Sequence, residues 1–350
     1  MGIAEYAMAK KLTRQPNYAL RFALLLAGFL LILFVSFFLG QYEMTAGDVC
    51  KIFFSRIFSI EKTWDDSAER ILFLYRAPRA LAAALIGGAL ALAGVSYQGM
   101  FSNPMVSPDV LGASTGAGFG AALAILLGCT GSAVSAAAFV FGLLAVFLAY
   151  VISRKSRTNP TLAMILAGMM ISSLFSAGTS FLKLVADVDS QLPAITYWLM
   201  GSLSDIRQAD LLPLCIPLLL GAVPLFLLRW RINLLTVGEE EASAMGINTK
   251  ALRLTVVICA TLLTAASVSV SGMIGWVGLV IPHFCRLLFG CDYRRLVPAS
   301  VLFGGAFLML VDNISRTVTT AGIPLGILTS FVGAPVFLYL ILTGGGRRDP

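Results

Sequence analysis

The sequence predicts an all-α membrane protein in which about ten helices cross the bilayer as one compact bundle. Hydrophobic residues make up 58% of the 350-residue chain and charged residues only 12%, whereas soluble domains carry roughly 25% charged residues. The mean hydropathy is +0.88. The apolar residues fall in long segments that contain scarcely an ionisable side chain, so we expect a multi-pass protein of the cell membrane.

The spans follow from length, because a helix needs about 20 mostly apolar residues to cross the hydrocarbon core with its backbone bonded internally. Candidate spans run over residues 20–40, 77–99, 110–128, 132–152, 160–182, 210–229, 253–271, 274–289, 296–313 and 324–343. They define a ten-helix domain at 20–343, a cytoplasmic N-terminus at 1–19 and a cytoplasmic tail at 344–350. The longest outer loop, 41–75, carries no functional expectation.

Features of single spans support this assignment. The first span, 20–40, is longer than the apolar region of a typical signal peptide and no A-x-A-like site follows it, so we expect it to remain as an anchor. In the third span Gly112, Gly116 and Gly120 recur every four residues. That spacing presents a face without side chains, which a neighbouring helix can approach closely.

Basic residues predict the orientation, because Lys and Arg concentrate in cytoplasmic loops. They cluster before the first span, at 154–157, at 229–231, at 294–295 and at 347–348. An even number of spans then puts both termini in the cytoplasm. The net charge of +7 reflects this topology rather than nucleic-acid binding, since the basic residues are dispersed at helix ends instead of gathered in one stripe.

The sequence lacks residues that several classes of function require. No G-x-x-x-x-G-K-[ST] loop occurs, so this chain is not expected to be an enzyme and any ATP must be hydrolysed by a partner. No acidic residue lies at mid-span, which disfavours an ion-coupled secondary transporter, although a carbonyl-lined sodium site would escape this test. His283, Cys285 and Cys291 suggest a metal site, but residues 283 and 285 point to different helix faces and no carboxylate converges on them. We therefore expect no metal site and no bound cofactor.

Residues 231–252, between the sixth and seventh spans, predict a short docking helix on the cytoplasmic side. Acidic residues after Gly238 suit the positive N-terminal end of a helix, and Gly246 fits the position after its C-terminus. Ala242 and Met245 give it an apolar face. The candidate docking residues are Gly238, Glu239, Glu240, Glu241, Ala242, Met245 and Gly246. A merely solvated surface helix is the alternative.

Other candidate residues lie at span ends. Arg76, Arg79 and Arg316 are placed at the outer side, where the orientation rule gives no reason for them. They predict contacts with an outer partner, with snorkelling toward headgroups or an i,i+4 pair of Asp312 with Arg316 as alternatives. At the inner end of the second span, Asn103-Pro104 predicts either part of an inner gate or a simple turn.

Together these motifs resemble the FecCD type of ABC-transporter permease, the group that imports iron–siderophore complexes, haem and vitamin B12. The resemblance covers about residues 65–345 and rests on Arg76-Ala77-Pro78-Arg79, Asn103-Pro104, Gly238 to Gly246, Gly275 to His283, and Pro324-Leu325-Gly326. Motif positions for which we expect a structural role are Gln98, Pro282, His283, Arg286 and Asp292. Met105-Val106 and Trp276 depart from the common pattern, which leaves the cargo open.

The resemblance implies a type II importer architecture. A second permease copy, expected to be identical, would enclose a central pathway, with two ATP-binding subunits below and an extracytoplasmic binding protein above. ATP and Mg would bind only to the partner subunits. The segment Gly238 to Gly246 would be the coupling helix, and the three outer arginines would meet carboxylates of the binding protein.

The expected function is therefore inward transport of a metal chelate, with a ferric siderophore as the preferred cargo. Haem, cobalamin or a related oxyanion remain alternatives within the family. An ion-coupled secondary transporter and a non-transporting scaffold or receptor remain alternatives from other classes. The absence of intramembrane charges weakens the first of these two, and the docking helix weakens the second.

Overall fold

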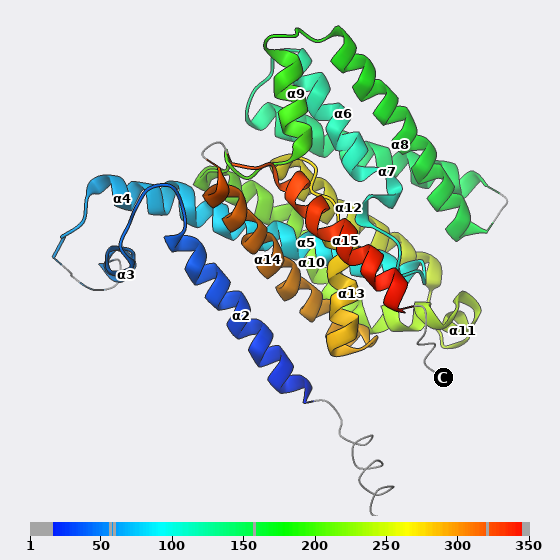
Figure 1. The fold of residues 1–350 in the computed structure, drawn as a ribbon. Helices are drawn as coiled ribbons and strands as arrows, with labels where there is room; N and C mark the ends of the chain where they lie inside the picture. The colour runs from blue at the N-terminus through cyan, green and yellow to red at the C-terminus, as the bar shows by residue number, and fades with distance from the viewer. Residues whose placement is uncertain (1–16, 56–57, 59–60, 157–158, 320–321, 345–350) are drawn as a thin grey trace, which may run out of the picture.

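The computed structural model describes residues 17–55, 58, 61–156, 159–319 and 322–344. Most of the expected N-terminal segment 1–19 and nearly all of the expected tail 344–350 therefore lie outside the described residues. The described part is helical and contains no strand (Figure 1). Its helices are α2 (Tyr18–Phe38), α3 (Ala46–Ser55), α4 (Asp66–Ile71), η1 (Leu72–Arg76), α5 (Ala77–Met100), η2 (Pro108–Leu111), α6 (Ala113–Leu126), α7 (Ser132–Lys155), α8 (Pro160–Val185), α9 (Gln191–Met200), α10 (Gln208–Val237), α11 (Glu239–Ala244), α12 (Thr249–Ser271), α13 (Val277–Phe289), α14 (Tyr293–Val318) and α15 (Leu325–Gly344).

The predicted fold class is confirmed. Within the described residues, seven apolar helices are long enough to span a membrane, and α6, α13 and α15 are shorter apolar helices. Each of these ten helices overlaps one of the ten predicted ranges. The predicted elements omit α3, α4 and α9, which are short helices between spans, and the predicted sixth span stops eight residues before the end of α10 at Val237.

The core forms around α5, in which every residue from Ile86 to Met100 is buried. α14, α12, α10 and α13 pack around it, and α6 to α9 form a group along one side (Figure 1). Small residues permit this packing: a Cβ atom added at Gly94 of α5 would lie 1.9 Å from the carbonyl oxygen of Gly278 in α13. Backbones at that separation leave no room for a side chain, so the glycine is required.

The outer loop 41–75 folds into a small lobe. Val49 and Ile52 of α3 and Ala68 of α4 are buried against Leu72, and aromatic residues from the end of α2 cover them. Figure 1 shows this lobe projecting sideways, with α4 and the π-helical turn η1 leading directly into α5. The lobe thus holds the end of α2 beside the start of α5.

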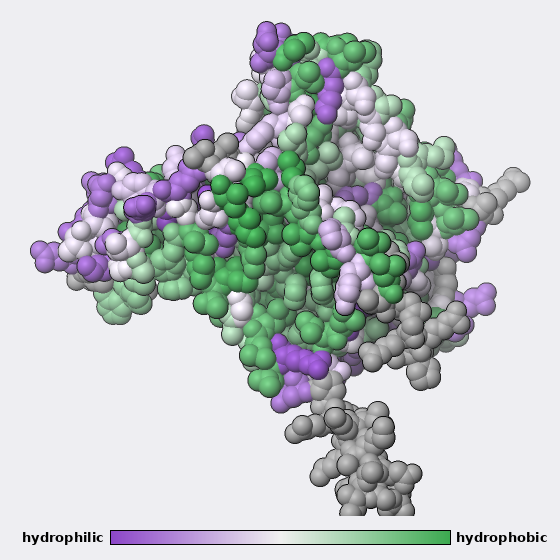
Figure 2. Space-filling view, viewed as in Figure 1, coloured by the Kyte–Doolittle hydropathy of each residue, from purple (hydrophilic) through white to green (hydrophobic). Residues whose placement is uncertain are grey.

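The molecular surface carries an apolar belt. In the view of Figure 2, hydrophobic residues dominate the middle of the molecule, while hydrophilic residues gather on the lobe and toward the upper and lower ends. Many large side chains of the transmembrane helices are exposed, among them Leu174, Leu220 and Phe331. Exposed apolar surface of this extent is expected where lipid or another subunit covers it.

Candidate functional site

The segment between α10 and α12 forms the short helix that the sequence predicts. α11 starts after Gly238, whose φ of 147° is rare for residues with side chains, and Gly246 follows its end at φ 82°. The amide of Gly246 donates to Ser243 O at 2.9 Å and that of Ile247 to Ala242 O at 3.1 Å. These bonds close the helix at the predicted glycine.

The predicted apolar face of α11 is divided between the interior and the surface. Ala242 is fully buried within this chain, whereas Met245 is 53% exposed. Of the predicted apolar face, Ala242 therefore packs into the core of this chain and Met245 alone is exposed; the role of the segment in coupling stays a prediction. Glu240, Glu241 and Met245 are among the exposed residues of the segment.

A polar junction fixes the end of α10 to the start of α14. The Asn233 side chain donates from Nδ2 to Asp292 Oδ1 at 2.7 Å and accepts from the amide of Tyr293 at 2.9 Å. Asp292 also caps α14 by accepting from the amide of Arg294 at 3.0 Å. Beside them, Ser102 Oγ of the turn after α5 donates to Leu235 O at 3.2 Å. The last two turns of α10, directly before α11, are thus bonded to α14 and to the end of α5.

The sequence motifs predict a structural role for Asp292 but give no indication of Asn233. An asparagine two residues after a cluster of span-end arginines is a weak signal by itself. Only the fold brings it to a residue 59 positions away. The pKa of Asp292 is held below its usual range: partial burial raises it, but the Arg294 amide, the Asn233 side chain and the nearby guanidinium groups of Arg294 and Arg295 outweigh that effect.

At the opposite end of the bundle, Arg79, Asp312 and Arg316 form a buried ion cluster. Arg79 Nε donates to both carboxylate oxygens of Asp312, at 2.8 and 3.1 Å. Arg316 Nε lies 3.7 Å from the same carboxylate and its Nη2 donates to Ser36 O at 2.7 Å. The Asp312 side chain is only 1% exposed, so the cluster ties α2, α5 and α14 together.

Arg76 is also held inside the chain. Its guanidinium donates to the carbonyl oxygens of Phe37 and Phe38, at 3.1 and 2.9 Å, and to Tyr42 O. The first two carbonyls belong to the C-terminal end of α2, which lacks helical partners and needs donors. Arg76 and Arg316 are therefore bonded inside this chain, and Arg316 forms the i,i+4 pair with Asp312 that the sequence offers as an alternative. Arg79 is the most exposed of the three, at 15%, and contact of these arginines with an outer partner stays a prediction.

The motif residues near the α11 end form a second polar network. Arg286 of α13 donates from Nη2 to Gln98 Oε1 of α5 at 2.6 Å, and Gln98 Nε2 donates to Val106 O at 3.2 Å. Asn103 Oδ1 accepts from the amide of Met105 at 2.9 Å. This network holds the exposed Asn103-Pro104 turn against α5 and α13, which fits a turn and leaves the gate a prediction.

Two motif residues remain, Pro282 and His283. Pro282 is buried and His283 is half-buried in α13. No three His, Cys, Asp or Glu side chains among the described residues are grouped so that they could hold a metal ion.

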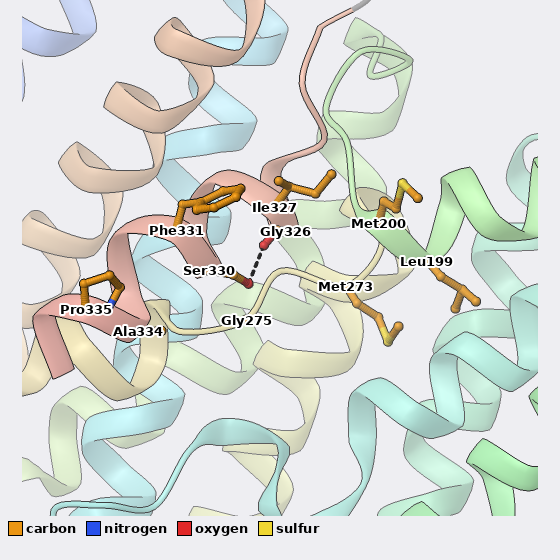
Figure 3. A pocket seen from close by; sticks show the side chains of 10 residues that line it. All are labelled: Leu199, Met200, Met273, Gly275, Gly326, Ile327, Ser330, Phe331, Ala334 and Pro335. Atoms are coloured by element: carbon orange, nitrogen blue, oxygen red, sulfur yellow. Dashed lines mark hydrogen bonds between the residues drawn. The ribbon is translucent and has the colours of Figure 1, made fainter. Parts of the chain in front are cut away.

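A large cavity lies on one side of the bundle between α9, the segment before α13, and α15 (Figure 3). Its volume is about 640 Å³, and its lining residues are Leu199, Met200, Met273, Gly275, Gly326, Ile327, Ser330, Phe331, Ala334 and Pro335. None of these residues is charged. The only hydroxyl group among them, Ser330 Oγ, is occupied by a 2.7 Å bond to Gly326 O. Such a wall offers van der Waals contact without strong polar anchors.

The bundle of apolar helices, the uncharged cavity and the short helix between α10 and α12 define a multi-pass membrane permease subunit. The model of the FecCD transport family matches residues 28–343. The chain belongs to this family, and it is an ABC importer permease.

Known relatives agree with this assignment. The molybdate import system permease protein MolB of Haemophilus influenzae is 38% identical over 317 residues, covering 90% of this chain and 94% of MolB. A probable iron chelatin transport system permease protein of Helicobacter pylori is 41% identical over 276 residues, covering 79% of this chain and 83% of that protein. A solved inward-facing structure of a putative metal-chelate type ABC transporter matches with a TM-score of 0.82 at 36% identity, over 91% of this chain and 97% of that one.

Proposed function

We propose that this chain is the membrane subunit through which a metal chelate, with a ferric siderophore as the preferred cargo, moves into the cell. ATP hydrolysis on two partner ATP-binding subunits drives the movement, and an extracytoplasmic binding protein delivers the cargo. Both termini lie in the cytoplasm, where the basic helix ends favour them. The chain itself binds no nucleotide.

The observation that carries this proposal is the construction of α11. Its exposed residues Glu240, Glu241 and Met245 project from a segment of only six helical residues. The Asn233 junction holds the end of α10, before α11. After α11, Ile247 packs against the core cluster that contains Ala242 and residues of α12. A partner that pushes on α11 therefore moves α10, α12 and α14 together rather than bending a loop.

The cavity supports a bulky cargo. A chelate about the size of a siderophore has much apolar and delocalised surface, which an uncharged wall contacts without holding it tightly. Weak retention is what a pathway needs, since the cargo must leave on the other side. Haem and cobalamin share this property, so they remain the main alternatives.

An oxyanion is the second candidate cargo, because the relative MolB is named for molybdate. A small dianion would leave its hydration shell at a cost unless donors replaced it. The cavity of one chain offers no free side-chain donor among its ten lining residues. On this ground the chelate is the preferred proposal.

A second permease copy, in our proposal identical to the first, would complete the pathway. The cavity is open on one side, and α15 exposes further apolar residues beyond the lining, such as Leu338 at 59% and Leu342 at 75%. A partner that carries the same face would cover this surface and enclose the cargo between two uncharged walls. For the binding protein, we propose Arg79 as a contact because, at 15%, it is the most exposed of the three outer arginines.

The cargo is tested by uptake into proteoliposomes that contain this chain with its ATP-binding subunits and its binding protein. Ferric siderophores, haem, cobalamin and molybdate, each labelled, are offered singly and in competition. Accumulation of ferric siderophore that the other three do not compete would support the proposal. Accumulation of molybdate alone would replace it with oxyanion import, and binding without accumulation would indicate a receptor.

A further inference from the structure

A second cavity lies near the α11 end, on the outside of the bundle, where α10 meets the start of α14. It has a volume of about 450 Å³ and is lined by Phe226, Leu227, Arg229, Trp230 and Arg294. The proposed uptake pathway does not use it, since the first cavity is lined by other helices. Its lining combines two cations with three large apolar side chains.

The two cations lack acidic partners within the described part of the chain. There, no carboxylate lies within 4.0 Å of a guanidinium nitrogen of Arg229 or Arg294. Asp292, the nearest acid along the chain to Arg294, is bonded to Asn233 and to the Arg294 amide instead. Asp292 lies near enough to Arg294 for its pKa to be lowered, but neither arginine forms an ion pair, so both guanidinium groups can donate to a bound anion.

Next to the arginines the surface of α10 is continuously apolar. Exposed residues recur along one face of this helix at Leu212, Ile216, Leu219, Val223 and Leu227. From residue 212 to 227 the helix rises roughly 22 Å, which is comparable to an extended acyl chain. Trp230, 42% exposed, marks the end of this face nearer α11, and tryptophan prefers the boundary between hydrocarbon and headgroups.

We propose that this cavity binds an anionic phospholipid of the leaflet on the α11 side. The phosphodiester lies between Arg229 and Arg294, the glycerol region lies beside Trp230, and one acyl chain follows the apolar face of α10. A lipid fits better than a free anion because the lining includes the apolar side chains of Phe226 and Leu227. It fits better than a protein partner because exposed Leu227 continues the apolar face of α10 at membrane depth. Basic pockets between helices on the cytoplasmic side are typical sites for anionic headgroups.

A lipid in this cavity would lie next to the Asn233 junction, which holds the end of α10 before α11. Arg229 lies one turn before Asn233 on α10, and Arg294 lies two residues after Asp292. A phosphodiester that bridges the two arginines thus joins the same two helices as the Asn233 junction. Lipid binding is expected to stabilise that junction from the membrane side.

The test measures lipid affinity by native mass spectrometry of the permease assembled with its ATP-binding subunits. Phosphatidylglycerol, phosphatidylcholine and inorganic phosphate are titrated separately. The variants are R229Q, R294Q and their double, with R154Q as the matched control, since Arg154 is an exposed arginine of the last turn of α7 on the same predicted side. The double variant R229K/R294K keeps the charge.

We expect each single variant to weaken phosphatidylglycerol binding about fivefold and the double variant about 25-fold, because each arginine supplies about one charged interaction with the headgroup. R154Q and R229K/R294K should bind within about threefold of the parent, and phosphatidylcholine binding should be unaffected. Parent-like affinity in R229Q/R294Q, or an equal loss in R154Q, would overturn the proposal. Full competition by inorganic phosphate would reassign the cavity to a free anion, and binding only after removal of the ATP-binding subunits would reassign it to a protein interface.

Discussion

Replacing Asn233 with Asp tests whether the junction between α10 and α14 transmits motion from α11. In N233D a carboxylate oxygen replaces the donor that now lies 2.7 Å from Asp292 Oδ1. The variant loses a hydrogen bond to a charged group, about 1.5 kcal/mol at this partly exposed site. It also places two carboxylates in contact, which adds about 1 to 2 kcal/mol of repulsion near a surface. We expect the free energy of unfolding to fall by about 3 kcal/mol.

The exchange variant N233D/D292N restores the pair with the partners reversed. The amide introduced at position 292 can donate to the carboxylate introduced at position 233 and still cap α14 through its oxygen. That carboxylate in turn accepts from the Tyr293 amide as Asn233 does. The double-mutant cycle should therefore give a coupling energy of about 2 kcal/mol. The assays are thermal unfolding in detergent and cargo transported per ATP hydrolysed in proteoliposomes.

Both readouts should fall in N233D and recover in the exchange variant, while basal ATP hydrolysis of the partner subunits persists. Normal transport per ATP in N233D, despite the loss of stability, would show that the junction is structural and transmits nothing. No recovery in N233D/D292N would refute the hydrogen-bond reasoning itself.

The same structure makes four further predictions. Because the pKa of Asp292 is lowered in the folded protein, its carboxylate stabilises the fold above the unfolded pKa, and this stabilisation is lost as the pH falls through the folded pKa. The free energy of unfolding should therefore decline less below about pH 4 in D292N than in the parent. Equal acid-induced declines in the two proteins would contradict this. Arg76→Gln should lower the free energy of unfolding by about 3 kcal/mol, because three carbonyl oxygens lose a charged donor. Capture of the binding protein per folded molecule should stay unchanged. Normal stability with impaired capture would instead indicate a docking role for Arg76. Gly94→Ala should lower the free energy of unfolding by about 3 kcal/mol, because the added Cβ would lie 1.9 Å from Gly278 O. The control Gly28→Ala should be nearly neutral, since no atom lies within 4 Å of its added Cβ. Similar melting temperatures of the two variants would refute the close approach of α5 and α13. M245E should weaken co-purification of the ATP-binding subunits without lowering the melting temperature of the permease. A242E should lower that melting temperature, because Ala242 is buried. Retained assembly in M245E would exclude Met245 from the interface.

Features that depend on local sequence could be predicted. Span length and hydropathy placed α5 within one residue of its bounds, Ala77–Met100, and the glycines at 238 and 246 marked both ends of α11. In these cases neighbouring residues determine the structure. The length of an apolar segment determines a membrane helix, and a glycine at positive φ determines a helix end.

Features that depend on distant partners could not be predicted. Arg76 looks like a surface arginine at a span end until α3 and α4 fold beside it and bring the end of α2 within reach. Ala242 and Met245 look equivalent on a helical wheel, yet only the packing of α11 on the chain decides which is buried. Asn233 carries no motif, and its role arises from a contact with Asp292 at the start of another helix.

The most direct test of the central claim is the dependence of uptake on the partner ATPase. Proteoliposomes with this chain, its binding protein and either intact or hydrolysis-deficient ATP-binding subunits would be supplied with ATP and offered labelled ferric siderophore, with and without ionophores that collapse ion gradients. Accumulation with the intact subunits alone, insensitive to ionophores, is the result we expect. Accumulation that persists with the deficient subunits and stops with ionophores would contradict the account and establish ion-coupled transport.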